Sequence, residues 1–210
     1  HDFYSPWYAY HFNNPNVSDD EVLSTAGNDY YFSYGNAVFV GLNSNNHLIE
    51  DHRAALKRAV NEYPDAEWRI VMMHTTMYFP GASEKSETIA ELFTPIFDEF
   101  DIDIVFSGHE HIYSRSYPMA NGVRDEDGVV YFQASTASGC NYYNTDEDDE
   151  RIEFYQSMPE PSYSIVEFKG NALSVKSYTT DSDELFDEFS IEKSAGDNNT
   201  EQHKMPMWYL

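Results

Sequence analysis

The sequence has little cysteine, little positive charge and no long apolar run. Its 210 residues include one cysteine, Cys140, so neither an intrachain disulfide nor a cysteine-based zinc site can form. Only 12 Lys and Arg oppose 37 Asp and Glu, which gives a net charge of −25. This balance argues against binding to nucleic-acid backbones or anionic membranes, because both need cationic contacts. No run of about 18 apolar residues is present, so we expect no membrane span.

The start of the chain is also unusual. It begins with His1 rather than Met and shows no signal peptide, so we expect that His1 is not the natural translation start and that targeting information has been removed. Hydrophobic residues make up 41% and aromatic residues 16% of the chain, which argues against disorder. The length suffices for one domain with a substantial core.

The most informative stretch is an apolar run followed by two histidines one residue apart. The run, 102–106, is rich in β-branched residues, which predicts a strand buried on both faces. We expect Gly108 to let the chain leave this strand through a conformation that a side chain would obstruct. His109 and His111 then follow the carboxyl end of the strand, where ligand sites of α/β sheets gather. Because neutral imidazole is a common metal ligand, the pattern indicates a metal site.

A second apolar run, 68–73, also ends in a histidine, His74. A helix over 46–63 is predicted before it by apolar residues at three-to-four spacing, with Asn46 as its cap. Paired strands over 30–33 and 37–42 are predicted earlier still. Because two buried strands are each followed by histidine, we expect these histidines to lie together in one cluster.

The rest of the chain completes an α/β pattern. A helix is expected from Thr88 with a capping box and a kink or break at Pro95. Further strands are expected over 129–134, 162–168, 172–178 and 185–191, and we expect the last three to add antiparallel strands to a sheet. The domain is expected to span residues 1–193, and 194–210 is interpreted as a C-terminal tail or linker.

Two motifs carry a family resemblance. Val71-Met72-Met73-His74 and Gly108-His109-Glu110-His111 match the V-x-x-H and G-H-x-H motifs of calcineurin-like metallophosphoesterases, with the purple acid phosphatase-like branch as the nearest. Residues 31–43 and 112–118 also resemble that branch, and the likeness covers about residues 1–190. It implies an α/β/β/α sandwich of the metallophosphoesterase type, here lacking its N-terminal strands.

The resemblance also implies a site. His74 and His109 would bind one metal ion and His111 a second, each ion being Fe, Zn or Mn. His1-Asp2 looks like the second half of a G-N-H-[DE] motif, so His1 would contact the phosphate or protonate the leaving oxygen. Tyr78 would contact the substrate or serve in packing. The aspartate motifs D-x-[HG] and G-D-x-x-[DY] are absent and would precede His1.

The expected activity is hydrolysis of a phosphorylated small molecule, a phosphomonoester, through a binuclear metal centre. A phosphodiesterase of the same family, a non-catalytic surface or interaction module, and a domain binding a single ion remain alternatives. We expect an extracellular or cell-surface location, and a structural ion pair for Arg115. We expect little phosphatase activity from the chain alone, since the aspartate ligands are missing.

Overall fold

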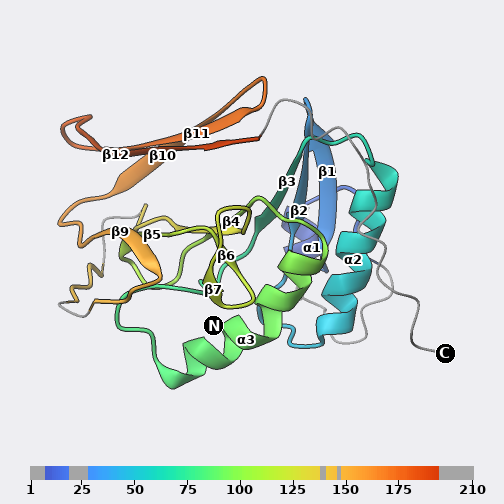
Figure 1. The fold of residues 1–210 in the computed structure, drawn as a ribbon, viewed down its shortest axis with the longest axis horizontal. Coiled ribbons are helices and arrows are strands. Elements are labelled where there is room, and N and C mark those ends of the chain that lie inside the picture. The colour runs from blue at the N-terminus through green and yellow to red at the C-terminus, as the bar shows by residue number, and fades with distance from the viewer. Residues whose placement is uncertain (1–7, 19–27, 138–140, 146–147, 194–210) are drawn as a thin grey trace. The chain divides into compact units, whose positions relative to one another are not determined.

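The computed structural model describes residues 8–18, 28–137, 141–145 and 148–193 (Figure 1). The chain divides into two compact units, His1–Ser162 and Tyr163–Leu210, which are described separately. Among the described helices, none has the length and apolar character needed to cross a membrane.

A mixed seven-stranded sheet forms the first unit. Its strands follow the order β1-β2-β3-β4-β8-β5-β9. The strands are β1 (Tyr30–Tyr34), β2 (Ala37–Gly41), β3 (Trp68–Met72), β4 (Ile104–Ser107), β5 (Tyr113–Ser116), β8 (Val130–Gln133) and β9 (Ile152–Gln156). Strands β2, β3, β4 and β8 are parallel to one another, whereas β1, β5 and β9 run antiparallel to their neighbours. The predicted α/β class is therefore confirmed.

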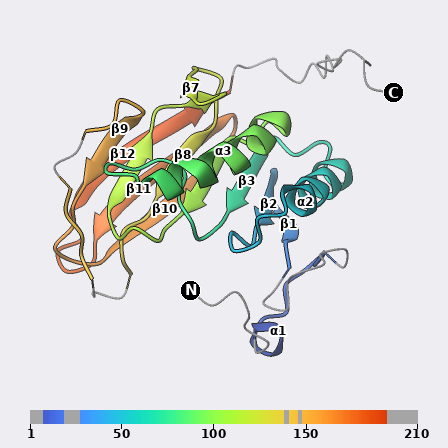
Figure 2. The same cartoon turned by 90° about the horizontal axis from the view of Figure 1, so that it is seen from below.

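Two long helices, α2 (Ile49–Glu62) and α3 (Glu84–Glu99), lie on the same side of this sheet (Figure 2). They pack on a row of side chains that crosses four strands in register: Val40, Val71, Val105 and Tyr131. A short helix α1 (Tyr8–His11) and a two-stranded ribbon, β6 (Met119–Ala120) with β7 (Val123–Arg124), complete the described part of the unit.

The central strand is buried on both faces, as its apolar run predicts. Ile104 and Val105 project to opposite faces of the sheet and are 0% and 1% exposed. Full burial on both faces explains why this run lacks the alternation of a half-exposed strand.

The predicted helix ends need correction. Helix α3 begins one turn earlier than expected, because the Ser83 hydroxyl caps it by accepting a hydrogen bond from the Ser86 amide. Thr88 lies inside the helix and donates to the Glu84 carbonyl, so the predicted capping box is wrong. The helix continues through Pro95 without a break. Helix α2 likewise starts after Leu48 rather than at Asn46.

The second unit holds a three-stranded sheet, β10 (Ser162–Lys169), β11 (Ala172–Thr179) and β12 (Leu185–Glu192), in that order. Gly170 takes a φ of +60° in the tight turn between β10 and β11, a conformation that glycine adopts at low cost. These strands form a sheet of their own, and their positions match the three strands expected over 162–168, 172–178 and 185–191. Residues 194–210 lie outside the described residues, and the tail boundary stays a prediction.

Candidate metal centre

Two neighbouring strands deliver the first two predicted ligands. Strands β3 and β4 are parallel, so their carboxyl ends meet at one edge of the sheet. The pairing continues past both strands, because the Met73 amide donates to the Phe106 carbonyl at 3.0 Å and the Gly108 amide donates to the His74 carbonyl at 3.0 Å. His74 and His109 therefore leave the sheet side by side.

Their imidazole rings converge. His74 Nε2 lies 3.0 Å from His109 Nδ1, and the rings are nearly perpendicular, with centroids 4.9 Å apart and an interplanar angle of 82°. Two ring nitrogens that bind one ion at about 2.0–2.1 Å lie about 2.9–3.4 Å apart for angles between 90° and tetrahedral. The observed separation falls in this range, so the pair fits a metal ion.

Charge effects favour the neutral form of His74, which is the ligand form. Burial lowers the pKa of His74, and the nearby His109 and His111 lower it further. On the other side of the pair, Glu110 Oε1 lies 3.7 Å from His109 Nε2. At this distance the carboxylate lies beyond hydrogen-bond range and acts on the His109 ring through its charge alone.

The loop that carries the histidines has an unusual backbone. His109 has a φ of +84° and His111 a φ of +53°, in the left-handed region that side chains usually avoid. Such conformations cluster at functional sites, where the surrounding structure holds them in place. Gly108 has no positive φ, and a Cβ added there would meet nothing within 4 Å. The expectation that Gly108 supplies the special conformation is therefore wrong, since the two histidines adopt it.

His111 turns toward a different partner. Its Nδ1 lies 2.5 Å from the Asn141 carbonyl oxygen, and its ring stacks on Tyr143 with centroids 5.2 Å apart. Because a carbonyl only accepts hydrogen bonds, Nδ1 carries the proton and the neutral ring keeps its lone pair on Nε2. This tautomer suits a metal ligand.

The histidines do not complete a site by themselves. Within the parts of the chain that the structure describes, no group of three or more His, Cys, Asp or Glu side chains is arranged to hold a metal ion. The structure brings His74 and His109 together and directs His111 toward Asn141. His1 lies outside the described residues, so its role stays a prediction.

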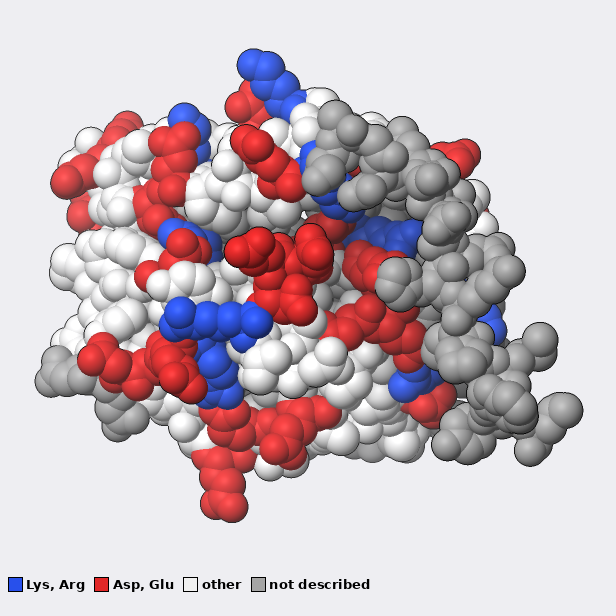
Figure 3. Space-filling model, in the orientation of Figure 1, with Lys and Arg blue, Asp and Glu red and all other residues white. Residues whose placement is uncertain are grey.

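Surface charge bears on any anionic ligand. Acidic side chains are widespread over the face drawn in Figure 3. Arg115, which is 7% exposed, contacts Glu153, which agrees with the structural role expected for it. Arg151 is likewise paired with Glu87 and Asp149. Because these arginines already face carboxylates, attraction of a phosphate would rest on bound metal ions.

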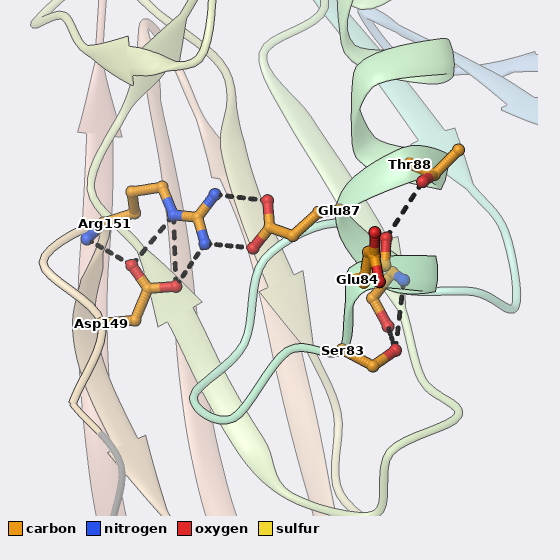
Figure 4. Close-up of polar contacts among 7 residues, drawn as sticks. Ser83, Glu84, Glu87, Thr88, Asp149 and Arg151 are labelled. Atoms are coloured by element: carbon orange, nitrogen blue, oxygen red, sulfur yellow. Dashed lines mark hydrogen bonds and ion pairs between the residues drawn. The ribbon is translucent and has the colours of Figure 1, made fainter.

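Tyr78, the predicted substrate contact, lies on the wall of a pocket of about 460 Å³ beside α3. The residue is 4% exposed, its ring meets Tyr131 edge-on at 4.9 Å, and the Arg151 guanidinium lies 4.8 Å from its centre. Figure 4 shows Arg151 held between Glu87 and Asp149. These contacts support the packing role for Tyr78, and a substrate contact stays a prediction.

Sequence reasoning missed the residues that hold the histidine loops. The Ser44 hydroxyl accepts hydrogen bonds from the Thr75 amide at 3.2 Å and the Thr75 hydroxyl at 3.1 Å, next to His74. Gln133, fully buried on β8, donates from Nε2 to the Ile112 carbonyl at 2.6 Å, next to His111. No local motif marks either residue, because each contact joins distant parts of the chain.

A family match accords with this geometry. Residues 1–113 match the model of the family described as calcineurin-like phosphoesterase. The chain belongs to the calcineurin-like phosphoesterase family. The mixed sheet with its flanking helices is the metallophosphoesterase-type α/β fold, and the two histidine motifs within residues 1–113 lie at its strand ends. The resemblance to the purple acid phosphatase-like branch is confirmed by the relatives.

Those relatives are phosphatases. Over 113 residues the chain is 30% identical to purple acid phosphatase 1 of Ipomoea batatas, covering 48% of this chain and 22% of that protein. Over 131 residues it is 25% identical to Fe(3+)-Zn(2+) purple acid phosphatase 12 of Arabidopsis thaliana, covering 55% of this chain and 26% of that protein.

A solved structure is similar as well. The purple acid phosphatase PPD1 from yellow lupin seeds (Lupinus luteus) superposes with a TM-score of 0.62 at 14% identity, covering 80% of this chain and 33% of that one. At this identity the likeness supports the fold alone. The chain spans about a third or less of the length of each of these three proteins.

Proposed function

We propose that the protein hydrolyses phosphomonoesters, in the manner of an acid phosphatase, through a binuclear metal centre of which this chain holds the histidine-bearing half. The observation that carries the proposal is the 3.0 Å approach of His74 Nε2 and His109 Nδ1 at the ends of adjacent parallel strands. The family match to residues 1–113 and the phosphatase relatives support the reaction class.

Each residue has a distinct role in this proposal. His74 and His109 bind one ion through Nε2 and Nδ1, and His111 binds the second through Nε2, with Asn141 holding its tautomer. Burial lowers the pKa of His74, which favours the neutral ring that a metal ion needs. His1 contacts the phosphate or protonates the leaving oxygen.

The two metal ions are Fe, Zn or Mn, since sites of imidazole and oxygen ligands suit all three. The relative named as an Fe(3+)-Zn(2+) purple acid phosphatase supports the first two. When bound, such a pair supplies Lewis-acid polarisation of a phosphoryl group and acidifies water. The aspartate ligands of the two missing motifs would come from outside this chain.

A phosphodiesterase is the main competing reaction, because the histidine motifs are shared within the family. Hydrolysis of p-nitrophenyl phosphate and of bis(p-nitrophenyl) phosphate by the natural protein that carries this chain separates the two. The proposal predicts faster hydrolysis of the monoester, and loss of that activity by at least about 100-fold in His109→Ala. His11→Ala, which alters an exposed histidine of α1, serves as the control and is expected to keep full activity.

Two results would contradict the proposal. Preferential hydrolysis of the diester would replace it with the phosphodiesterase, and absence of both activities would favour a non-catalytic surface or interaction module. The 210-residue chain alone is expected to show little activity, because the aspartate ligands are missing. We further propose an extracellular or cell-surface location, consistent with the purple acid phosphatase-like branch.

A further inference from the structure

A histidine on α2 and a carboxylate that precedes β1 form a fully buried pair. His52 on α2 and Asp29 before β1 have side chains that are both 0% exposed, and His52 Nδ1 lies 2.5 Å from Asp29 Oδ2. The other ring nitrogen, Nε2, lies 2.8 Å from the Asn46 carbonyl oxygen. The pair is thus held on both sides, and the roles proposed above for the metal ligands do not use it.

The proton count shows what kind of pair it is. A backbone carbonyl only accepts hydrogen bonds, so His52 Nε2 must carry a proton. The contact between Nδ1 and the carboxylate needs a second proton, which lies on the ring or on Asp29. Both ring nitrogens are therefore engaged in hydrogen bonds. The pair thus serves to hold the surrounding backbone in place, as an anchor, and does not act as a general base.

The anchor holds both ends of one loop. The second carboxylate oxygen of Asp29, Oδ1, accepts a hydrogen bond from the Asn43 amide at 2.7 Å. With the contact from His52 to the Asn46 carbonyl, the pair fixes the backbone at residues 43 and 46. Ser44 lies between these two points and is 5% exposed. The loop that carries Ser44 thus cannot shift without breaking a buried contact.

Ser44 links this loop to the backbone next to the proposed metal ligand His74. Its hydroxyl oxygen accepts from the Thr75 amide and the Thr75 hydroxyl, at 3.2 and 3.1 Å, and Thr75 directly follows His74. On the other side, the His74 carbonyl accepts from the Gly108 amide. The backbone around His74 is therefore fixed from the Ser44 loop and from the loop that bears His109.

We propose that Asp29, His52 and Ser44 are positioning residues for the metal centre, which hold the His74 imidazole at the spacing from His109 that a metal ion requires. The inference rests on the proposed function, since it assigns a role toward the proposed ligand His74. None of the three residues contacts a metal or a substrate in this account. Groups that orient metal ligands from behind commonly affect metal affinity about 10–100-fold.

Ser44→Ala in the natural protein that carries this chain is the sharpest test, because it removes one hydroxyl and leaves the buried pair intact. We would titrate the metal-free, 15N-histidine-labelled protein with Co²⁺ and follow the broadening of the histidine ring signals by NMR. Ser44→Ala is expected to weaken Co²⁺ binding by about tenfold. Ser44→Thr, which keeps the hydroxyl, is expected to restore it. Ser33→Ala, at an exposed serine of β1, is the matched control.

The outcomes separate this inference from the proposed function. If His74→Ala abolishes Co²⁺ binding while Ser44→Ala binds like the wild type, the positioning role is wrong and the proposed ligand stands. If the wild-type natural protein binds no Co²⁺, or if its His74→Ala variant binds Co²⁺ as tightly as the wild type, both are wrong. A parallel loss in Asp29→Asn, in a variant that stays folded by circular dichroism, would support transmission from the buried pair.

Discussion

Replacing Asp29 by Ala is expected to destabilise the protein strongly, because the carboxylate is fully buried and bridges two partners. It accepts from the Asn43 amide at 2.7 Å and contacts His52 at 2.5 Å. Removal of one member of a buried pair leaves the other without compensation, which typically costs about 3–5 kcal/mol. Since small domains have a total free energy of unfolding of about 5–15 kcal/mol, the loss is a large fraction of the stability.

The assay is urea unfolding of the 210-residue chain, followed by tryptophan fluorescence. Trp68 on β3 is 0% exposed, so its share of the emission from the chain's three tryptophans reports the core of the sheet. Asp65→Ala, at an exposed aspartate, is the matched control and is expected to change the free energy of unfolding by less than about 0.5 kcal/mol. If Asp29→Ala loses no more stability than Asp65→Ala, the anchoring role of the pair is refuted.

Three further predictions concern the network beside Tyr78. Arg151→Met removes a bidentate ion pair with Glu87, at 2.8 and 2.5 Å, and a contact to Asp149 at 2.6 Å. The free energy of unfolding should therefore fall by about 1–3 kcal/mol. An unchanged midpoint of urea unfolding would contradict this prediction. Burial raises the pKa of Asp149, but hydrogen bonds from Arg151 outweigh burial, so the pKa is lowered overall. The stabilisation that charged Asp149 contributes is therefore present above the ordinary aspartate pKa and is lost as the pH falls through the lowered pKa. Asp149→Asn should therefore lose stability at pH 7 but little in strong acid, whereas an equal loss at both pH values would contradict the assignment. Burial raises the pKa of Asp98 despite a hydrogen bond from the Asn121 amide, so the charged carboxylate destabilises the fold. Asp98→Asn should therefore unfold at a higher temperature than the wild type in calorimetry at pH 7, and this gain should vanish below pH 3.8. A gain that persists below pH 3.8 would contradict the assignment.

The strands that line the site were predictable because their side chains are apolar on both faces. The runs over 68–73 and 102–106 correspond to β3 and β4, and their parallel pairing brings His74 and His109 together. The helices that join β2 to β3 and β3 to β4 agree with the parallel pairing of these strands.

Strand β5 escaped prediction for a physical reason. Its sequence, Tyr113-Ser114-Arg115-Ser116, is mostly polar and shows no alternation, yet all four residues are buried. Two of its polar side chains have partners: Arg115 contacts Glu153, and the Ser116 hydroxyl accepts from the Tyr131 amide at 2.9 Å. The buried Ser114 hydroxyl has no hydrogen-bond partner among the described residues. Partners of this kind are invisible in a local pattern.

The support around the metal centre was unpredictable for the same reason. The Asp29–His52 contact joins residues 23 apart in sequence, and the Ser44–Thr75 contact joins residues 31 apart. The sequence places His52 in the predicted helix over 46–63 and carries no sign of its partner. Which polar group a buried histidine meets depends on how the helix packs, and that is decided by the whole fold.

The metal content of the natural protein that carries this chain tests the central claim most directly. Elemental analysis of the purified protein is predicted to give two ions per chain, and His74→Ala is predicted to lose at least one of them. His11→Ala, with an exposed histidine changed, is predicted to keep both. A natural protein without bound metal, or a His74→Ala variant with unchanged metal content, would contradict the account.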